Sequence, residues 1–133
     1  MKTAIKALSL VSLVGTCVVS ITGCGESVVS FENDVRPILH KNCLECHQPG
    51  GKGFEASGLA IGTYDDLMKG TKPGNSEQRG QIVIPGDATS SALIMLIEGR
   101  ADPSIKMPHG KEPLNEKSVT TLRKWVEQGA QNN

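Results

Sequence analysis

The sequence contains one Cys-x-x-Cys-His motif, Cys43-Leu44-Glu45-Cys46-His47, and this motif constrains the chain more than any other feature. Two cysteines separated by two residues and followed by a histidine can form part of a zinc site, a redox-active dithiol or the attachment site of a c-type haem. Each alternative requires different residues elsewhere in the chain. The other cysteines and histidines therefore decide among them.

Residues 1–23 have the features of an export signal. Lys2 and Lys6 precede an uncharged apolar run that is short for a permanent transmembrane helix. The run ends in the sequence ITGC, which resembles the lipobox of bacterial lipoproteins, where cleavage precedes a cysteine that receives the lipid. We expect a lipoprotein signal peptide over residues 1–23, lipidation of Cys24 and a lipidated tether over residues 24–30. Cleavage nearby without lipidation is the alternative.

The mature chain has the size of one small domain. About 110 residues remain after the signal, which suits a single domain of modest size. Of the 14 basic residues, two lie in the signal, so 12 remain against 14 acidic residues and the net charge is −2. This charge, without a basic patch, argues against a nucleic-acid partner. The 15 glycines and seven prolines predict long loops, so the fold needs a disulfide, a metal or a buried cofactor.

The cysteine count favours the haem interpretation of the motif. If Cys17 leaves with the signal and Cys24 carries lipid, the folded domain retains only the two motif cysteines. A structural zinc site has four ligands, and the spacing of His40 and His109 fits no common zinc motif. A thioredoxin-like dithiol needs a surrounding βαβ unit, whereas this sequence predicts a helix followed by a glycine-rich loop.

Cys-x-x-Cys-His is the attachment pattern of a c-type haem. We expect Cys43 and Cys46 to form thioethers with the two porphyrin vinyl groups, and His47 to be the proximal axial ligand of the iron. Such attachment takes place outside the cytoplasm, where the export signal directs the chain. We expect a carbonyl of the following loop, at Pro49, to accept the second ring N–H of His47.

A helix is expected to deliver Cys43 to its place. Apolar and polar positions recur at helical spacing over residues 31–42. Pro37 interrupts this pattern, because proline is tolerated only in the first turn of a helix or at a kink. Either Asn33 or Asp34 therefore caps the helix, or its first turn is bent.

The remaining elements are short. We expect a capped helix from Thr63 to Gly70, a loop over residues 71–80, an extended segment over residues 82–86, an apolar helix over residues 92–98 after Ser90 or Ser91, and a final helix from Asn115 to Gly129. Residues 48–53 are expected to form a flexible loop. Trp125 in the final helix is expected to pack against the first helix near Phe31, and the alternative is that it shields or hydrogen-bonds the edge of the haem.

Met107 is the expected distal axial ligand. It lies in the sequence SIKMPHG, a proline-flanked loop without the apolar periodicity that would explain a methionine there. Met68 and Met95 fall within helical patterns, where methionine usually fills the core. His109 is the rival ligand and would give a bis-histidine haem. An open sixth position is the third alternative and would permit gas or peroxide binding.

Several motifs in a fixed order resemble the planctomycete-type cytochrome c domain, a branch of the class I monohaem c-type cytochromes. They are FENDVRPIL at 31–39, the Cys43–His47 motif, Gly58-Leu59, Pro85-Gly86-Asp87 before Ser90-Ser91-Ala92-Leu93, Met107-Pro108, Pro113-Leu114 and LRKWVEQGA at 122–130. The family often has a second proline after Met-Pro, where this chain has His109.

The resemblance implies an all-α class I cytochrome c fold over residues 31–133. A few short helices and long loops would surround one covalent haem c, the first and last helices would pack together, and Met107 would be the distal ligand. The expected function is single-electron transfer between a redox protein donor and acceptor, without enzymatic activity, by a lipoprotein anchored to a membrane of the bacterial cell envelope and facing the periplasm. The alternatives are a subunit of a larger periplasmic oxidoreductase, or a small peroxidase or gas-binding protein if the sixth position is open.

Overall fold

The computed structural model describes residues 26–72 and 78–133, in which all the regular secondary structure is helical and long loops connect the helices. Its elements are the π-helical turn η1 (Phe31–Val35), α1 (Arg36–Asn42), α2 (Lys52–Ser57), α3 (Tyr64–Lys69), α4 (Ala92–Ile97), the 3-10 turn η2 (Pro103–Ile105) and α5 (Glu116–Glu127). Within the described ranges there is no β-strand, only one isolated bridge between Thr71 and Gly80. The expected all-α class is confirmed. None of the described helices is long and apolar enough to cross a membrane, and the expected signal peptide and Cys24 lie outside the described residues.

The first helix begins three residues or more before the start that a cap at Asn33 or Asp34 would give. Ser30 is the N-cap, since its hydroxyl accepts the backbone N–H of Asn33 at 3.1 Å. The first turn is π-helical, with the Arg36 N–H donating to the carbonyl of Phe31. The expected cap at Asn33 or Asp34 is wrong. The bent first turn is observed instead, since a widened turn relieves the clash of the Pro37 ring with the preceding carbonyls.

An aromatic cluster joins the first helix to the last. The ring of Phe31 lies 5.6 Å from that of Trp125 and 5.2 Å from that of Tyr64, in an edge-to-face arrangement with Tyr64. Trp125 is 1% exposed, and its indole N–H donates to the carbonyl of Gln131 at 2.9 Å. The predicted contact between Trp125 and Phe31 is confirmed. The buried side chains Leu39, Leu67, Ile94, Leu122 and Val126 complete the centre of the same core.

The expected helix caps are confirmed for α3 and α5. The Thr63 hydroxyl accepts the N–H of Asp66 at 3.1 Å, and the side-chain oxygen of Asn115 accepts the N–H of Ser118 at 2.8 Å. Ser91 precedes α4, but its fully buried hydroxyl does not cap the helix. The Ser91 hydroxyl instead bonds to the extended segment that precedes α4, because it accepts the N–H of Ile84 at 2.8 Å.

Helix α2 is not expected from the sequence. Its first residues, Lys52 and Gly53, belong to the stretch predicted to be a flexible loop. The helix has six residues, ends at Gly58 in the left-handed conformation (φ 64°), and buries none of its residues fully. Glycine is a poor helix former, so local propensity gives no signal here.

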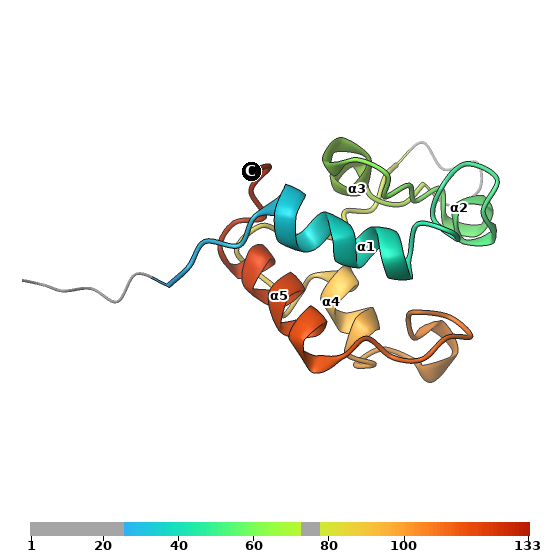
Figure 1. Ribbon diagram of the computed structural model, residues 1–133. Helices are drawn as coiled ribbons and strands as arrows, with labels where there is room; N and C mark the ends of the chain where they lie inside the picture. Colours follow the sequence, from blue (N-terminus) through green and yellow to red (C-terminus); the bar gives the residue numbers. More distant parts are fainter. Residues whose placement is uncertain (1–25, 73–77) are drawn as a thin grey trace, which may run out of the picture.

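The N-terminal segment is fastened to the end of the fold opposite the Cys-x-x-Cys-His motif. Glu26 pairs with Lys124 of α5 at 2.7 Å, and Gln128 accepts the N–H of Val29 at 2.8 Å. The carbonyl of Asn133 accepts the N–H of Glu32 at 3.0 Å, which brings the C-terminus beside the start of η1. Figure 1 shows the N-terminal segment leaving at one end of the η1–α1 helix, whereas α2 and the loop before α5 lie at the other.

Candidate haem-binding site

A tight turn after α1 brings Cys43, Cys46 and His47 close together. The helix ends at Asn42, and the N–H groups of Cys46 and His47 both donate to the carbonyl of Cys43, at 3.1 and 3.0 Å. Cys43 and Cys46 form no disulfide and are half-buried. Both thiols are therefore available for thioether bonds.

Burial raises the pKa of the Cys43 thiol to about 11, although Lys111 opposes the shift. Cys43 also contacts the hydrophobic core as a partly buried side chain. A thiol with this pKa is neutral at physiological pH, so Cys43 behaves as a small apolar group until it is modified. Such a group suits the wall of an apolar cofactor site.

The imidazole of His47 has one buried nitrogen without a hydrogen-bond partner. Nδ1 is inaccessible to solvent and makes no hydrogen bond of ordinary geometry. Burial lowers the pKa of His47, and a backbone contact with Leu59 offsets this only in part. The expected hydrogen bond to the Pro49 carbonyl is wrong, because Nδ1 has no partner and the backbone of α2 at Gly53 lies against the ring instead. A neutral imidazole is the form that binds a metal ion.

The loop between α4 and α5 carries Met107. Asp102 caps η2 by accepting the N–H of Ser104 at 2.8 Å, and the N–H of Met107 donates to the carbonyl of Leu96 in α4 at 3.2 Å. Met107 is half-buried and packs against the hydrophobic core, in agreement with an inward role. A hollow of about 270 Å³ within this loop is lined by Met107 and His109, among others. His109 is exposed.

An ion pair joins the two segments that carry the predicted ligands. Lys111 lies on the Met107 loop and contacts the carboxylate of Glu45, inside the motif, at 2.6 Å. The hydrogen bond and the charge of Glu45 raise the pKa of Lys111, and both motif cysteines add to this shift. The structure therefore brings the Met107 loop beside the end of α1, as Figure 1 shows for the orange loop.

The structure gives no support to the zinc alternative. His40 uses Nε2 in a hydrogen bond of 3.2 Å to the carbonyl of Gly62. Among residues 26–72 and 78–133, no three His, Cys, Asp or Glu side chains lie close enough together to hold a metal ion. His40 lies in α1, whereas His109 lies on the loop between α4 and α5.

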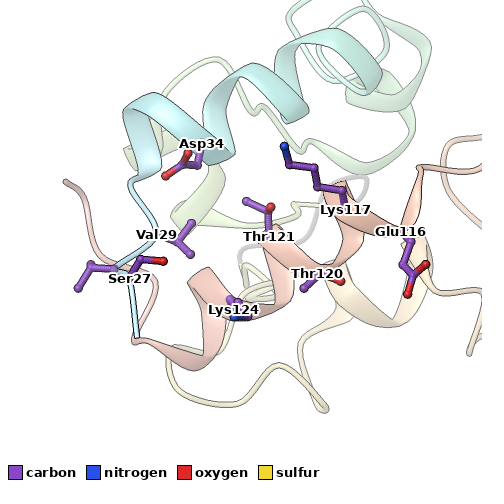
Figure 2. Close-up of a pocket in the computed structure, with 9 residues that line it drawn as sticks. Ser27, Val29, Asp34, Glu116, Lys117, Thr120, Thr121 and Lys124 are labelled. Atoms are coloured by element: carbon purple, nitrogen blue, oxygen red, sulfur yellow. The ribbon is translucent and has the colours of Figure 1, made fainter. Parts of the chain in front are cut away.

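A second hollow lies away from these residues. It has a volume of about 530 Å³ and is lined by the N-terminal segment and the polar face of α5, including Ser27, Asp34, Lys117 and Thr121 (Figure 2). Its lining contains neither cysteine, histidine nor methionine. This hollow therefore lacks the ligand types that haem iron accepts.

The residues present fit a covalent haem. The motif supplies two thiols that form no disulfide and the imidazole of His47, whose second nitrogen is shielded from solvent. The loop after α4 supplies the half-buried side chain of Met107, and one ion pair connects this loop to the motif. Glu45 and Lys111 were not singled out in the sequence, since their separation of 66 residues gives no local signal. Gly53 was also missed, although the Gly-Lys-Gly spacing is visible in the sequence.

The comparisons place the chain in a family. Residues 43–109 match the family model of planctomycete cytochrome C. The match begins at the first motif cysteine and includes Met107, so it contains all four predicted haem-binding residues. No curated protein and no solved structure matches the chain.

Proposed function

Because the chain belongs to the planctomycete cytochrome C family, we propose that it is an electron carrier that binds one haem c and transfers single electrons between two redox proteins. Cys43 and Cys46 hold the porphyrin, and His47 and Met107 are the axial ligands of the iron. The observation that carries the proposal is that the Met107 loop lies beside the motif, where the exposed side chains of Lys111 and Glu45 form an ion pair of 2.6 Å between the two segments.

The residues of the chain would suit an electron carrier in several ways. A bound haem supplies a one-electron redox centre, and two strong axial ligands leave it no open position. The backbone of α2 lies against the second nitrogen of His47, which is inaccessible to solvent, and Met107 packs half-buried against the hydrophobic core. Ligands held in this way change little between oxidation states.

The spectrum of a Met107→Ala variant tests the proposal. Wild type should be low-spin in the ferric state and show the methionine-to-iron charge-transfer band. The variant should lose that band and bind carbon monoxide or imidazole readily in the vacated position. Met68→Ala is the matched control, since Met68 also packs against the core and should keep the band.

Other results of the same experiment are equally informative. If Met107→Ala keeps the wild-type spectrum, Met107 is not the ligand, and the double variant with His109→Ala then tests the rival. If the wild-type protein is already high-spin and binds carbon monoxide, the sixth position is open. That result contradicts an electron carrier and favours a gas-binding protein or a peroxidase.

We further propose that the protein is exported and held at a membrane of the bacterial cell envelope by lipid on Cys24, with its haem domain facing the periplasm. The apolar leader and the ITGC sequence support this proposal. Cys24→Ser should release the haem protein from the membrane fraction into the soluble fraction. Wild-type protein that is recovered in soluble form without lipid would contradict the anchor.

We propose that electrostatic attraction contributes to the binding of the redox partners. The mature chain has a net charge of −2, to which the haem propionates would add. A partner with a positively charged patch is favoured by this sign. Electron transfer to such a partner should become slower as ionic strength rises.

A further inference from the structure

The backbone of α2 lies directly against the imidazole of His47. A Cβ atom built at Gly53 would lie 2.7 Å from His47 Cε1 and 3.0 Å from Nδ1. A Cβ at Gly51 would overlap the carbonyl of Cys46. Two glycines separated by Lys52 therefore allow the start of α2 to approach the motif at a distance that no side chain permits.

Hydrogen bonds prevent the two backbones from moving apart. The N–H of Phe54 in α2 donates to the carbonyl of Cys46 at 2.8 Å, and the N–H of Ile61 donates to the carbonyl of His47 at 3.0 Å. A methyl group at position 53 would meet a backbone that is fixed on both sides. Rotation of the imidazole about its Cβ–Cγ bond is the softest response, because this torsion has a broad minimum.

From this geometry we propose that Gly53 is a positioning residue for the proximal ligand. The absence of a side chain lets α2 cover Nδ1 and sets the rotation of the His47 ring. Groups packed against a ligating histidine fix its orientation and tune the metal. The inference rests on the proposed role of His47 as a haem ligand and adds the residue that orients it.

Gly53→Ala in the haem-loaded full chain tests the proposal. Electron paramagnetic resonance of the ferric protein and the hyperfine-shifted haem methyl signals in NMR both respond to the orientation of the axial ligand plane. We expect changed g values and displaced methyl signals in this variant. Exchange of the Nδ1 proton with solvent should also become roughly tenfold faster, as a small overpacking strain loosens the cover.

Gly62→Ala is the matched control. Gly62 is near the motif, but an added Cβ would meet only Leu44 Cδ1, at 3.9 Å. This variant should keep the wild-type resonance spectrum, methyl shifts and exchange rate. If Gly53→Ala gives the wild-type values as well, the proposal is overturned.

A measurement on the wild-type protein keeps the proposal testable if Gly53→Ala fails to incorporate haem. In the ferrous, diamagnetic state, the Hα protons of Gly53 and the Hε1 proton of His47 should show a strong nuclear Overhauser effect. Its absence would overturn the proposal whatever the variant does. A wild-type iron without histidine ligation would refute the proposed function, whereas an unchanged Gly53→Ala spectrum refutes only the positioning role.

Discussion

Trp125→Phe tests whether the single tryptophan belongs to the core or to the haem site. The indole is 1% exposed, its N–H donates to the carbonyl of Gln131 at 2.9 Å, and its ring lies 5.6 Å from that of Phe31. Phenylalanine keeps an aromatic ring but removes the hydrogen bond and part of the buried surface. A lost hydrogen bond costs about 0.5–1.5 kcal/mol, and the smaller ring adds a cavity term.

We expect Trp125→Phe to lower the free energy of unfolding by about 1–3 kcal/mol, and Trp125→Ala to lower it by about 3–5 kcal/mol. For a domain of this size each kcal/mol corresponds to roughly 4–8 °C in Tm. Circular dichroism at 222 nm during urea unfolding of the ferric protein gives the values without using tryptophan fluorescence. A double-mutant cycle with Phe31→Leu and Trp125→Leu should give a coupling energy of about 0.5–1.5 kcal/mol.

The same variant separates stability from ligation. Because the indole contacts Phe31 and Tyr64 at the end of α1 away from the motif, Trp125→Phe should leave the methionine-to-iron band unchanged. A variant that keeps the wild-type stability but shifts this band would refute the reasoning. Trp125 would then contact the haem rather than the aromatic cluster.

Three further predictions concern charges and caps. Asn115→Ala should lower the free energy of unfolding by about 1 kcal/mol in urea melts, since it removes the N-cap of α5. Burial of Glu98 raises its pKa, but hydrogen bonds from two arginines outweigh this and hold the pKa below its usual range. The free energy of unfolding of the wild type should therefore fall as pH drops through that lowered pKa. Glu98→Gln should be less stable than the wild type at pH 7, and its stability should depend less on acid pH. Lys111→Glu should roughly double or triple the rate at which added imidazole displaces the distal ligand. Adding Glu45→Lys to the same chain should restore the wild-type rate, because the charges of the pair are then exchanged. Equal rates in all three proteins would show that the ion pair does not affect the loop.

The elements that the sequence predicts well are those whose signal is local. Thr63 and Asn115 stand at the start of periodic segments, and each side chain satisfies a backbone N–H within its own first turn. The contact between Phe31 and Trp125 was also predictable, because both lie on the apolar faces of the two best-patterned helices. Pro37 marked a disturbance, but the sequence did not distinguish a delayed start from a π-helical turn, since both relieve the same clash.

The parts of the candidate site that were missed depend on contacts across the chain. Residues 48–53 read as a loop because glycines lower helix propensity, yet the contact with His47 requires those same glycines. Contacts with the motif, such as the hydrogen bond from the Phe54 N–H to the Cys46 carbonyl, therefore add to the stability of helix α2. The contact between Glu45 and Lys111 likewise exists only after the Met107 loop has returned to the motif. The chemistry of His47 and Met107 is enough to predict both as ligands from the sequence. The contacts around them, such as α2 against the His47 ring and Lys111 with Glu45, form only in the folded chain and therefore leave no local signal.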